Sequence, residues 1–157
     1  MITFVRGDLF KTTCEAVVNP CNCVGVAGHG LSLHFKELAP KNYDTYRDLC
    51  QMRMLRPGTC AVVGTGELGP NVKYVINLPT KDHWRDPSKI EYIRSGVADL
   101  VSAMRNFSIK SVAVPPLGCG CGMLDWNQVK SVIIEGLEYL GHDGLVFEIY
   151  EPYTGVV

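Results

Sequence analysis

The 157-residue sequence has no marked excess of charge of either sign and no long hydrophobic run. Fifteen lysines and arginines are balanced by sixteen acidic residues, for a formal net charge of −1, so only a local patch could attract a polyanion. No stretch is long enough to span a bilayer. The opening MITFVRGDLF also lacks the charged leader and long apolar run of a secretion signal. We therefore expect a cytoplasmic protein with no membrane partner.

The sequence also lacks internal repeats, low-complexity tracts and an evident linker. A length of 157 residues fits one domain that can bury its own core, and 46% hydrophobic with 20% charged residues is typical of a folded chain. Its seven cysteines are an odd number, and in a reducing compartment we expect free thiols. The sequence thus predicts a single domain over residues 1–157.

Six short apolar runs, rich in valine and isoleucine, predict β-strands. They are residues 2–5, 16–19, 60–64, 74–78, 111–116 and 145–150. Helical spacing of apolar residues predicts helices over 31–39, 88–105 and 126 to about 140. Ser88 with Glu91 resembles a capping box for the second helix, and Asp125 and Gly141 are expected to begin and end the third. Because the strands are apolar on both faces, we predict a mixed or parallel sheet covered on both sides, a three-layer α/β/α fold.

Two glycine-rich segments each lie between a predicted strand and a predicted helix. NPCNCVGVAGHGLSLHF follows strand 16–19, and PPLGCGCGMLDW follows the strand that begins at residue 111. Ligands of such sheets bind at the carboxyl ends of strands. Glycine lets the backbone approach a ligand closely, and successive N–H groups with a helix N-terminus attract anions. Two such loops could hold a diphosphate between them; the alternative is that both are tight turns of a compact fold.

The same two segments contain a pair of C-x-C motifs, Cys21 with Cys23 and Cys119 with Cys121. Four thiolates could hold zinc if the loops met in space. The usual spacing in structural zinc sites is two to four intervening residues, however, and small buried thiols are common in protein cores. The phosphate-binding interpretation is therefore favoured, and we expect no metal and no cofactor.

The motifs RGDLF, AVVNPCN and GCG occur in the order of the ADP-ribose-binding motifs of the macrodomain family, which the sequence resembles over its whole length. The segments NCVGVAGHGLSLHFK, INLPTKDHWRDPSKIEYI and VAVPPLGCGCGMLDW are similar to macrodomains of bacterial DNA ADP-ribosyl glycohydrolases, relatives of terminal ADP-ribose protein glycohydrolase. The resemblance implies a mixed central sheet, ADP-ribose as ligand, and removal of ADP-ribose from thymidine in single-stranded DNA. Because only a macrodomain is matched, the chain is an excised domain or a stand-alone relative, and a cognate ADP-ribosyltransferase toxin is a candidate partner.

The resemblance also implies roles for individual residues. Asp8 and Leu9 would contact the adenine, with Tyr150 packed nearby, while Asn22 would hold the distal ribose and share the catalytic site with Lys81. The segments 25–31 and 118–123 would enclose the diphosphate. The implied ADP-ribose contacts are Asp8, Leu9, Asn19, Cys21, Asn22, Gly28, Gly30, Leu31, Thr80, Gly118, Cys119, Gly120, Cys121, Gly122, Met123 and Tyr150.

Some positions depart from the family pattern. Residues 27–30 read AGHG where relatives often have MGKG, and Cys121 and Met123 stand where the DNA-directed relatives tend to have asparagine and glycine. Gly122 is nearest to the position of the catalytic aspartate in the animal enzyme. A Lys/Asp mechanism therefore cannot simply be carried over. A hydrolase of ADP-ribosyl carboxylate esters on protein and a non-catalytic ADP-ribose reader stay as alternatives.

Lys81 directly follows the predicted strand region 74–78 and so lies near a strand's carboxyl end. As a neutral amine it could attack the sugar, or as a cation it could stabilise the leaving group, which requires no pKa shift. The adjacent His83, Trp84 and Arg85 mix cationic and aromatic side chains, which suits phosphate contacts and base stacking with single-stranded nucleic acid. The alternative is a core tryptophan beneath solvated charges.

Overall fold

The computed structural model describes residues 1–152, and within them six strands form one mixed sheet. The strands are β1 (Ile2–Val5), β2 (Ala16–Cys21), β3 (Ala61–Gly64), β4 (Tyr74–Pro79), β5 (Ser111–Val114) and β6 (Val146–Tyr150). Their order across the sheet is β1-β6-β5-β2-β4-β3. Strand β3 is antiparallel to β4, and the other neighbouring pairs are parallel. The predicted strands and the mixed sheet are confirmed, with strand ends shifted by at most two residues.

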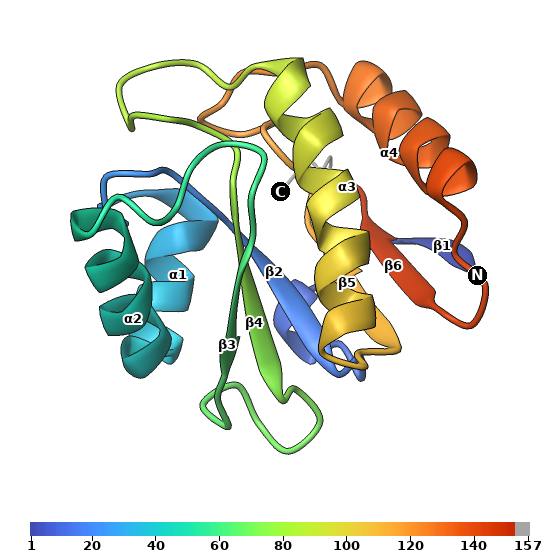
Figure 1. Ribbon diagram of the computed structural model, residues 1–157, viewed down its shortest axis with the longest axis horizontal. Coiled ribbons are helices and arrows are strands. Elements are labelled where there is room, and N and C mark those ends of the chain that lie inside the picture. Colours follow the sequence, from blue (N-terminus) through green and yellow to red (C-terminus); the bar gives the residue numbers. More distant parts are fainter. Residues whose placement is uncertain (153–157) are drawn as a thin grey trace.

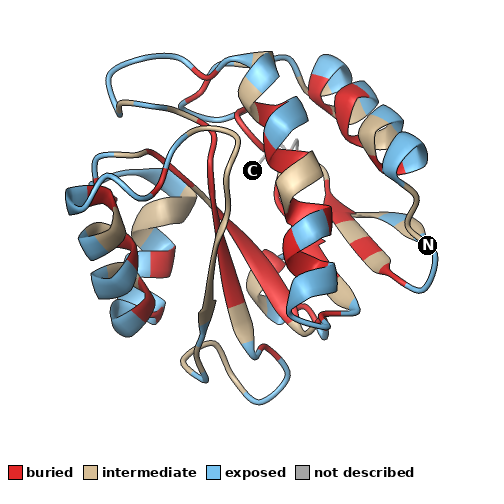
Figure 2. Cartoon of the chain, in the orientation of Figure 1, coloured by how far each residue is buried: buried red, intermediate tan, exposed pale blue. Residues whose placement is uncertain are grey.

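Helices cover both faces of this sheet, which confirms the three-layer fold (Figure 1). The helices are α1 (Gly30–Leu38), α2 (Pro40–Gln51), α3 (Ile90–Asn106), α4 (Trp126–Leu140) and the short 3-10 turn η1 (Leu9–Lys11). Alternate strand residues point to opposite faces, so Val18 and Ile76 pack with α3 and α4 while Val17 and Val75 pack with α1. The central strands are accordingly buried on both faces, as Figure 2 shows for β2 and β4.

The predicted caps are present in α4 but not in α3. The Asp125 carboxylate accepts a hydrogen bond from Gln128 N at 3.2 Å and caps α4, and Gly141 follows the helix with φ of 78°, as predicted. The capping box proposed for α3 is wrong. Lys89 is the N-cap and makes no side-chain cap bond, while Ser88 is buried one residue earlier.

Helix α2 has no counterpart among the predicted elements. Its sequence, PKNYDTYRDLCQ, is mostly polar, and Ala39 at its N-cap makes no side-chain cap bond. The cap comes instead from Glu67, in the connection between β3 and β4, whose carboxylate accepts from Lys41 N at 2.9 Å and Asn42 N at 3.2 Å. Burial alone would raise the Glu67 pKa, but these hydrogen bonds hold it below its usual value.

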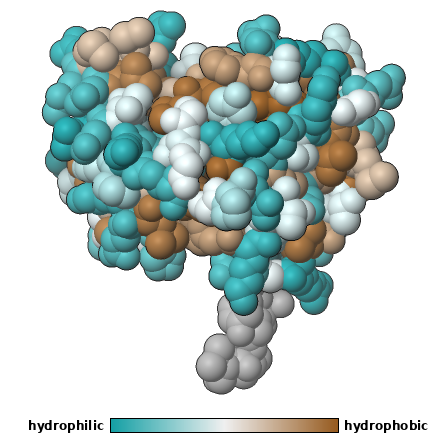
Figure 3. Space-filling model, turned by 90° about the horizontal axis from the view of Figure 1, so that it is seen from below, coloured by the Kyte–Doolittle hydropathy of each residue, from teal (hydrophilic) through white to brown (hydrophobic). Residues whose placement is uncertain are grey.

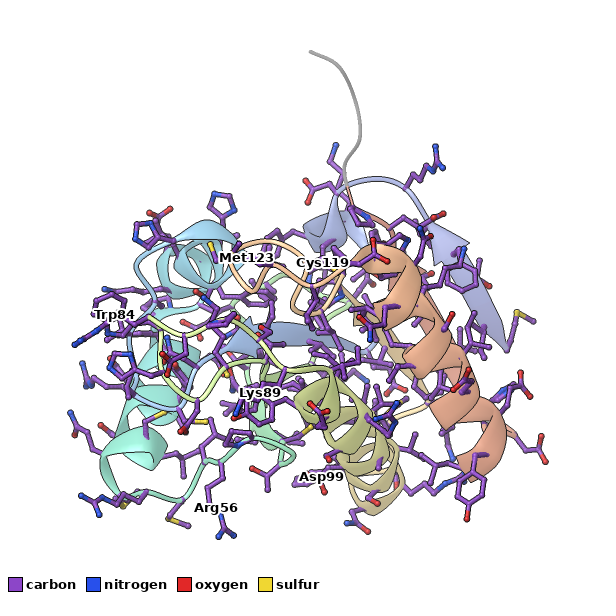
Figure 4. All side chains as sticks on the ribbon, turned by 90° about the horizontal axis from the view of Figure 1, so that it is seen from above. Arg56, Trp84, Lys89, Asp99, Cys119 and Met123 are labelled. Atoms are coloured by element: carbon purple, nitrogen blue, oxygen red, sulfur yellow. The ribbon has the colours of Figure 1, made fainter. Side chains whose placement is uncertain are left out.

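The two ends of the sheet differ in the residues that surround them. The parallel strands β2, β4, β5 and β6 end at the same edge, which Figure 4 views from above with Trp84, Cys119 and Met123 labelled. The opposite end, viewed from below in Figure 3, has hydrophilic residues interspersed with hydrophobic ones. Among residues 1–152, no helix has both the length and the hydrophobicity of a membrane span.

Candidate functional site

Two adjoining pockets lie at the carboxyl ends of the parallel strands. One, of about 450 Å³, is bordered by the ends of β2 and β4 and by both glycine-rich loops. The other, of about 460 Å³, extends from Asp8 and Leu9 to Tyr150. Leu31, Pro115 and Pro116 line both pockets, and we call the pair the composite pocket. The first pocket is lined by Pro20, Cys21, Asn22, Val26, Gly28, His29, Gly30, Leu31, Ser32, Thr80, Lys81, Trp84, Pro115, Pro116, Gly118, Gly120, Cys121 and Gly122.

The first glycine-rich loop is organised by Asn22. The Asn22 Oδ1 atom accepts from the backbone N–H groups of Val24, Gly25 and Val26 at 3.1, 3.2 and 3.4 Å. The loop then leads into α1, whose N-cap, His29, makes no side-chain cap bond. The first turn of α1 lines the pocket, and its N–H groups have no partner inside a helix. Together with the helix dipole they favour an anion there.

The second glycine-rich loop presents free N–H groups to the same pocket. Within residues 1–152, the backbone N–H groups of Gly120, Cys121 and Gly122 make no hydrogen bond. The loop is anchored at its ends, because Leu124 N donates to Gly118 O at 2.8 Å and Ser88 N donates to Gly122 O at 3.0 Å. All three unpaired groups belong to residues that line the pocket. The two loops therefore face each other with donors suited to a diphosphate.

Two glycines of this second loop have different physical roles. A Cβ added to Gly120 would meet nothing within 4 Å, so this residue borders open space. A Cβ added to Gly122 would collide with the Ser88 side chain and lie 2.5 Å from Gly118 O. Gly122 is thus required by packing against Ser88 and only Gly120 is free to carry a side chain into the pocket. The loop can therefore accept a glutamate at Gly120 but not at Gly122.

The loop that carries Lys81 is joined to the first glycine-rich loop by backbone hydrogen bonds. Thr80 N donates to Cys21 O at 2.8 Å, and Cys23 N donates to Asp82 O at 3.0 Å, so the pairing of β2 with β4 continues beyond both strands. The Lys81 ammonium donates to the Trp84 carbonyl at 3.3 Å. This contact holds the amine at the wall of the pocket.

Trp84 is 48% exposed, so the alternative of a core tryptophan is wrong. Its side chain borders the pocket, next to Lys81. The Arg85 guanidinium lies 5.1 Å from the Trp84 ring centroid, and the His83 ring centroid is also 5.1 Å away. The predicted cationic and aromatic segment is therefore a surface feature, and Figure 4 shows its Trp84 at the outer edge of the molecule.

The far end of the composite pocket combines apolar side chains with His34 and three acidic residues, Asp8, Glu37 and Glu151. Asp8 uses Oδ1 to accept from Phe10 N at 2.9 Å, and within residues 1–152 its Oδ2 makes no hydrogen bond. Leu9 and Tyr150 are buried beside it. Burial raises the pKa of the Tyr150 hydroxyl, which therefore stays protonated at neutral pH. A flat heterocycle with an exocyclic amino group fits these walls.

Three residues predicted to contact ADP-ribose do not line the composite pocket. Asn19 is buried between strands, where its Nδ2 donates to Asn77 Oδ1 at 2.9 Å. Cys119 packs toward the core beneath the loop. Met123 has φ of 65° and is 81% exposed. Sequence reasoning placed them by motif position, which does not reveal the direction of each side chain.

The thiols of the two C-x-C motifs do not form a metal site in the part of the chain that is described. No group of three or more His, Cys, Asp or Glu side chains is arranged for a metal within residues 1–152. Cys21 is buried with Tyr46 and Cys50, whereas Cys121 is exposed in the loop. Burial raises the pKa of Cys23 to about 12 and that of Cys119 to about 11, so both are neutral thiols at pH 7.

An α/β sheet with two backbone-donor loops and a helix N-terminus around an elongated pocket defines a binder of a nucleotide diphosphate. The Macro domain family model matches residues 18–133, and the chain belongs to that family.

The chain is 45% identical over 156 residues to the DNA ADP-ribosyl glycohydrolase of Mycobacterium tuberculosis, covering 99% of this chain and 43% of that protein. It is 43% identical over 152 residues to that of Thermus aquaticus, covering 97% and 41%. The chain thus spans less than half the length of the curated relatives it matches.

Two solved structures also superpose closely on this chain. The macrodomain of Mycobacterium tuberculosis DarG superposes with a TM-score of 0.91 at 43% identity, over 98% of this chain and 99% of that one. Thermosipho africanus DarTG in complex with ADP-ribose superposes with a TM-score of 0.88 at 30% identity, over 99% of this chain and 43% of that one.

Proposed function

We propose that this macrodomain binds ADP-ribose and removes it from thymidine in single-stranded DNA. The observation that carries the proposal is the position of Lys81, on the wall of a pocket with diphosphate donors and beside the exposed ring of Trp84. The names of the relatives, DNA ADP-ribosyl glycohydrolases, support the same activity. We also propose a cytoplasmic location and a cognate ADP-ribosyltransferase as partner; the transferase–glycohydrolase fusion protein of Thermosipho africanus, 30% identical over 165 residues, supports the partner.

The ligand would lie along the composite pocket. The adenine would occupy the end with Asp8, Leu9 and Tyr150, where the free Asp8 Oδ2 can accept from the exocyclic amino group. The diphosphate would lie between the first turn of α1 and the unpaired N–H groups of residues 120–122. The distal ribose would then reach Asn22 and Lys81. This order uses neutral backbone donors for the phosphates, which fits a chain of net charge −1.

The reaction breaks the bond between the distal anomeric carbon and the base. The bonding electron pair leaves with the base, and a water oxygen forms the new bond to the anomeric carbon as the water's proton passes to the departing base. A charged Lys81 would stabilise the developing negative charge on that base. Its hydrogen bond to the Trp84 carbonyl holds the ammonium in place before the substrate arrives. This role needs neither a neutral amine nor a second acidic residue at Gly122.

Single-stranded DNA would meet the segment His83–Arg85. The exposed Trp84 ring offers a surface for base stacking, and the Arg85 guanidinium can contact a backbone phosphate. In this arrangement the modified base enters the pocket mouth while its neighbours stay outside.

A three-substrate assay tests the proposal. The protein is incubated with thymidine-linked ADP-ribosyl single-stranded DNA, with an ADP-ribosyl carboxylate ester on protein, and with free ADP-ribose, while release and binding are followed. We expect release from the DNA and binding of free ADP-ribose. Release from the ester alone would replace the proposal with a protein-directed hydrolase. Binding without any release would make the protein a reader.

A further inference from the structure

We propose that Tyr46 is a positioning residue that orients Asn22 and thereby makes the pocket favour ligands with a distal ribose. The inference rests on the proposed ADP-ribose site. Tyr46 lies in the middle of α2 and does not itself line the pocket. Its hydroxyl lies 2.8 Å from Asn22 Oδ1 and 2.9 Å from Asn22 O, so one O–H group holds both the side chain and the main chain of Asn22.

The hydrogen bonds around Asn22 fix which end of its amide faces the pocket. Three backbone N–H groups, from Val24, Gly25 and Val26, point at one atom of the amide. Because N–H groups only donate, that atom must be the oxygen. The other atom, Nδ2, donates to Val26 O at 2.8 Å, and within residues 1–152 its second N–H makes no hydrogen bond. Asn22 lines the pocket, so it presents a free donor to the site where a ribose hydroxyl would lie.

The Tyr46 contact differs in kind from the other bonds to Asn22 Oδ1. The three backbone donors belong to the same loop as Asn22 and would move with it. Of the hydrogen bonds to this oxygen within residues 1–152, only that from Tyr46 comes from another element. Tyr46 therefore fixes the loop and the amide, as a unit, against the helix layer. Cys50, also in α2, adds a weak contact from Sγ to Asn22 O at 3.9 Å.

The environment of Tyr46 suits a fixed donor. The residue is 1% exposed and packs with Cys21, Cys50 and Leu55. Burial raises the pKa of its hydroxyl far above neutral, so the proton that Asn22 accepts is always present. A rigid ring whose hydroxyl donates to both Asn22 O and Oδ1 holds the amide in the orientation that the three backbone N–H groups select.

Calorimetric titration with ADP-ribose and with ADP, which lacks the distal ribose, tests the inference. In the wild type we expect ADP-ribose to bind more tightly than ADP. In Tyr46→Phe we expect the ADP-ribose affinity to fall by about tenfold, which corresponds to about 1.4 kcal/mol, while the ADP affinity changes by less than about twofold. In an Asn22→Ala background the Tyr46→Phe change should have no further effect on ADP-ribose, because the two residues act as one unit.

Two other tyrosines serve as controls. Tyr43 donates to Gly25 O at 2.9 Å in the same loop without contacting Asn22, so Tyr43→Phe should leave the ratio of ADP-ribose to ADP affinity unchanged. Tyr139 is fully on the surface of α4, and Tyr139→Phe should be neutral for both ligands.

The outcomes separate the inference from the proposed function. Equal losses for ADP-ribose and ADP in Tyr46→Phe, or an effect that persists in the Asn22→Ala background, would overturn the inference and leave the ADP-ribose site in place. A wild type that binds neither ligand would overturn the proposed function itself. If Tyr46→Phe does not fold, Asn22→Asp decides, since it keeps the contacts that Oδ1 accepts but removes the donor, together with the hydrogen bond from Nδ2 to Val26 O. It should lose the preference for ADP-ribose over ADP, and retention of the preference would refute the role of the donor.

Discussion

The open space beside Gly120 allows a direct test of the diphosphate site. Gly120→Glu places a carboxylate in the pocket without a steric conflict in the loop, because a Cβ there meets nothing within 4 Å. The backbone of Gly120 does not require a left-handed conformation either, since its φ is not positive. The substitution should therefore leave the fold intact and change only what the pocket can hold.

The size of the effect follows from electrostatics. Two unit charges of the same sign about 5 Å apart, at an effective dielectric constant of about 20, repel by about 3 kcal/mol. Each phosphate of the ligand would experience such a repulsion, reduced by solvent at the pocket mouth. An affinity loss of at least about a hundredfold, or about 2.7 kcal/mol, is expected. Gly120→Gln separates charge from size and should cost much less.

Calorimetric titration with ADP-ribose measures this loss, and Gly66→Glu is the matched control. Gly66 also has nothing within 4 Å and no positive φ, but it lies in the connection between β3 and β4, away from the composite pocket. The Gly66→Glu variant should bind ADP-ribose with the affinity of the wild type and should have an unchanged melting temperature. Wild-type affinity in a folded Gly120→Glu would refute the assignment of this loop to the diphosphate. Gly122→Glu is unsuitable, because the clash with Ser88 would disturb the fold itself.

Other expectations concern catalysis, DNA binding and stability. Lys81→Ala should keep ADP-ribose affinity within about tenfold while lowering the single-turnover rate of release from modified DNA by about a hundredfold; a wild-type rate would show that another residue acts. Arg85→Ala should weaken binding to modified single-stranded DNA and reduce the salt dependence of that binding. The control Lys73→Ala, in the connection from β3 to β4, should change neither quantity. If both variants weaken DNA binding equally, Arg85 makes no specific contact with DNA. Glu67→Gln should lower the free energy of unfolding by about 1 kcal/mol at pH 7. Because the folded-state pKa of Glu67 lies below its unfolded value, this difference should disappear in urea titrations as the pH falls through the folded-state pKa, and a pH-independent difference would refute the capping role.

The central strands were predictable because they are buried on both faces. Runs such as 74–78 are almost uniformly apolar, and no local rule competes with that signal. The location of the pocket was predictable as well, since parallel strands bring their carboxyl ends to one edge whatever the details of the loops; that a ligand binds there stays a prediction. Leu31, Gly120 and Lys81 all line the pocket, where the sequence motifs predicted a ligand.

Features that depend on contacts between distant segments were not predictable. Helix α2 has Pro40 at its first position, which is a start signal in the sequence, but the side chain that caps it, Glu67, lies in a distant connection. Tyr46 was missed with the helix. Gly120 and Gly122 look equivalent in the sequence, and only the packing of Ser88, from the segment before α3, separates them. The partners that matter are Glu67 for α2, Asn22 for Tyr46 and Ser88 for Gly122, and each lies more than 20 residues away along the chain.

The continued pairing of β2 with β4 has a consequence for how a ligand enters and leaves. The bonds from Thr80 N to Cys21 O and from Cys23 N to Asp82 O join the loop of Asn22 to the loop of Lys81, so these two sides of the pocket move as one body. The loop that contains Gly120 is held to the rest of the pocket mainly at its ends and has unpaired N–H groups between them. Opening is therefore easiest on that side. We expect the loop around Gly120 to be the more mobile wall of the pocket, and the joined loops of Asn22 and Lys81 to be the fixed wall against which it closes.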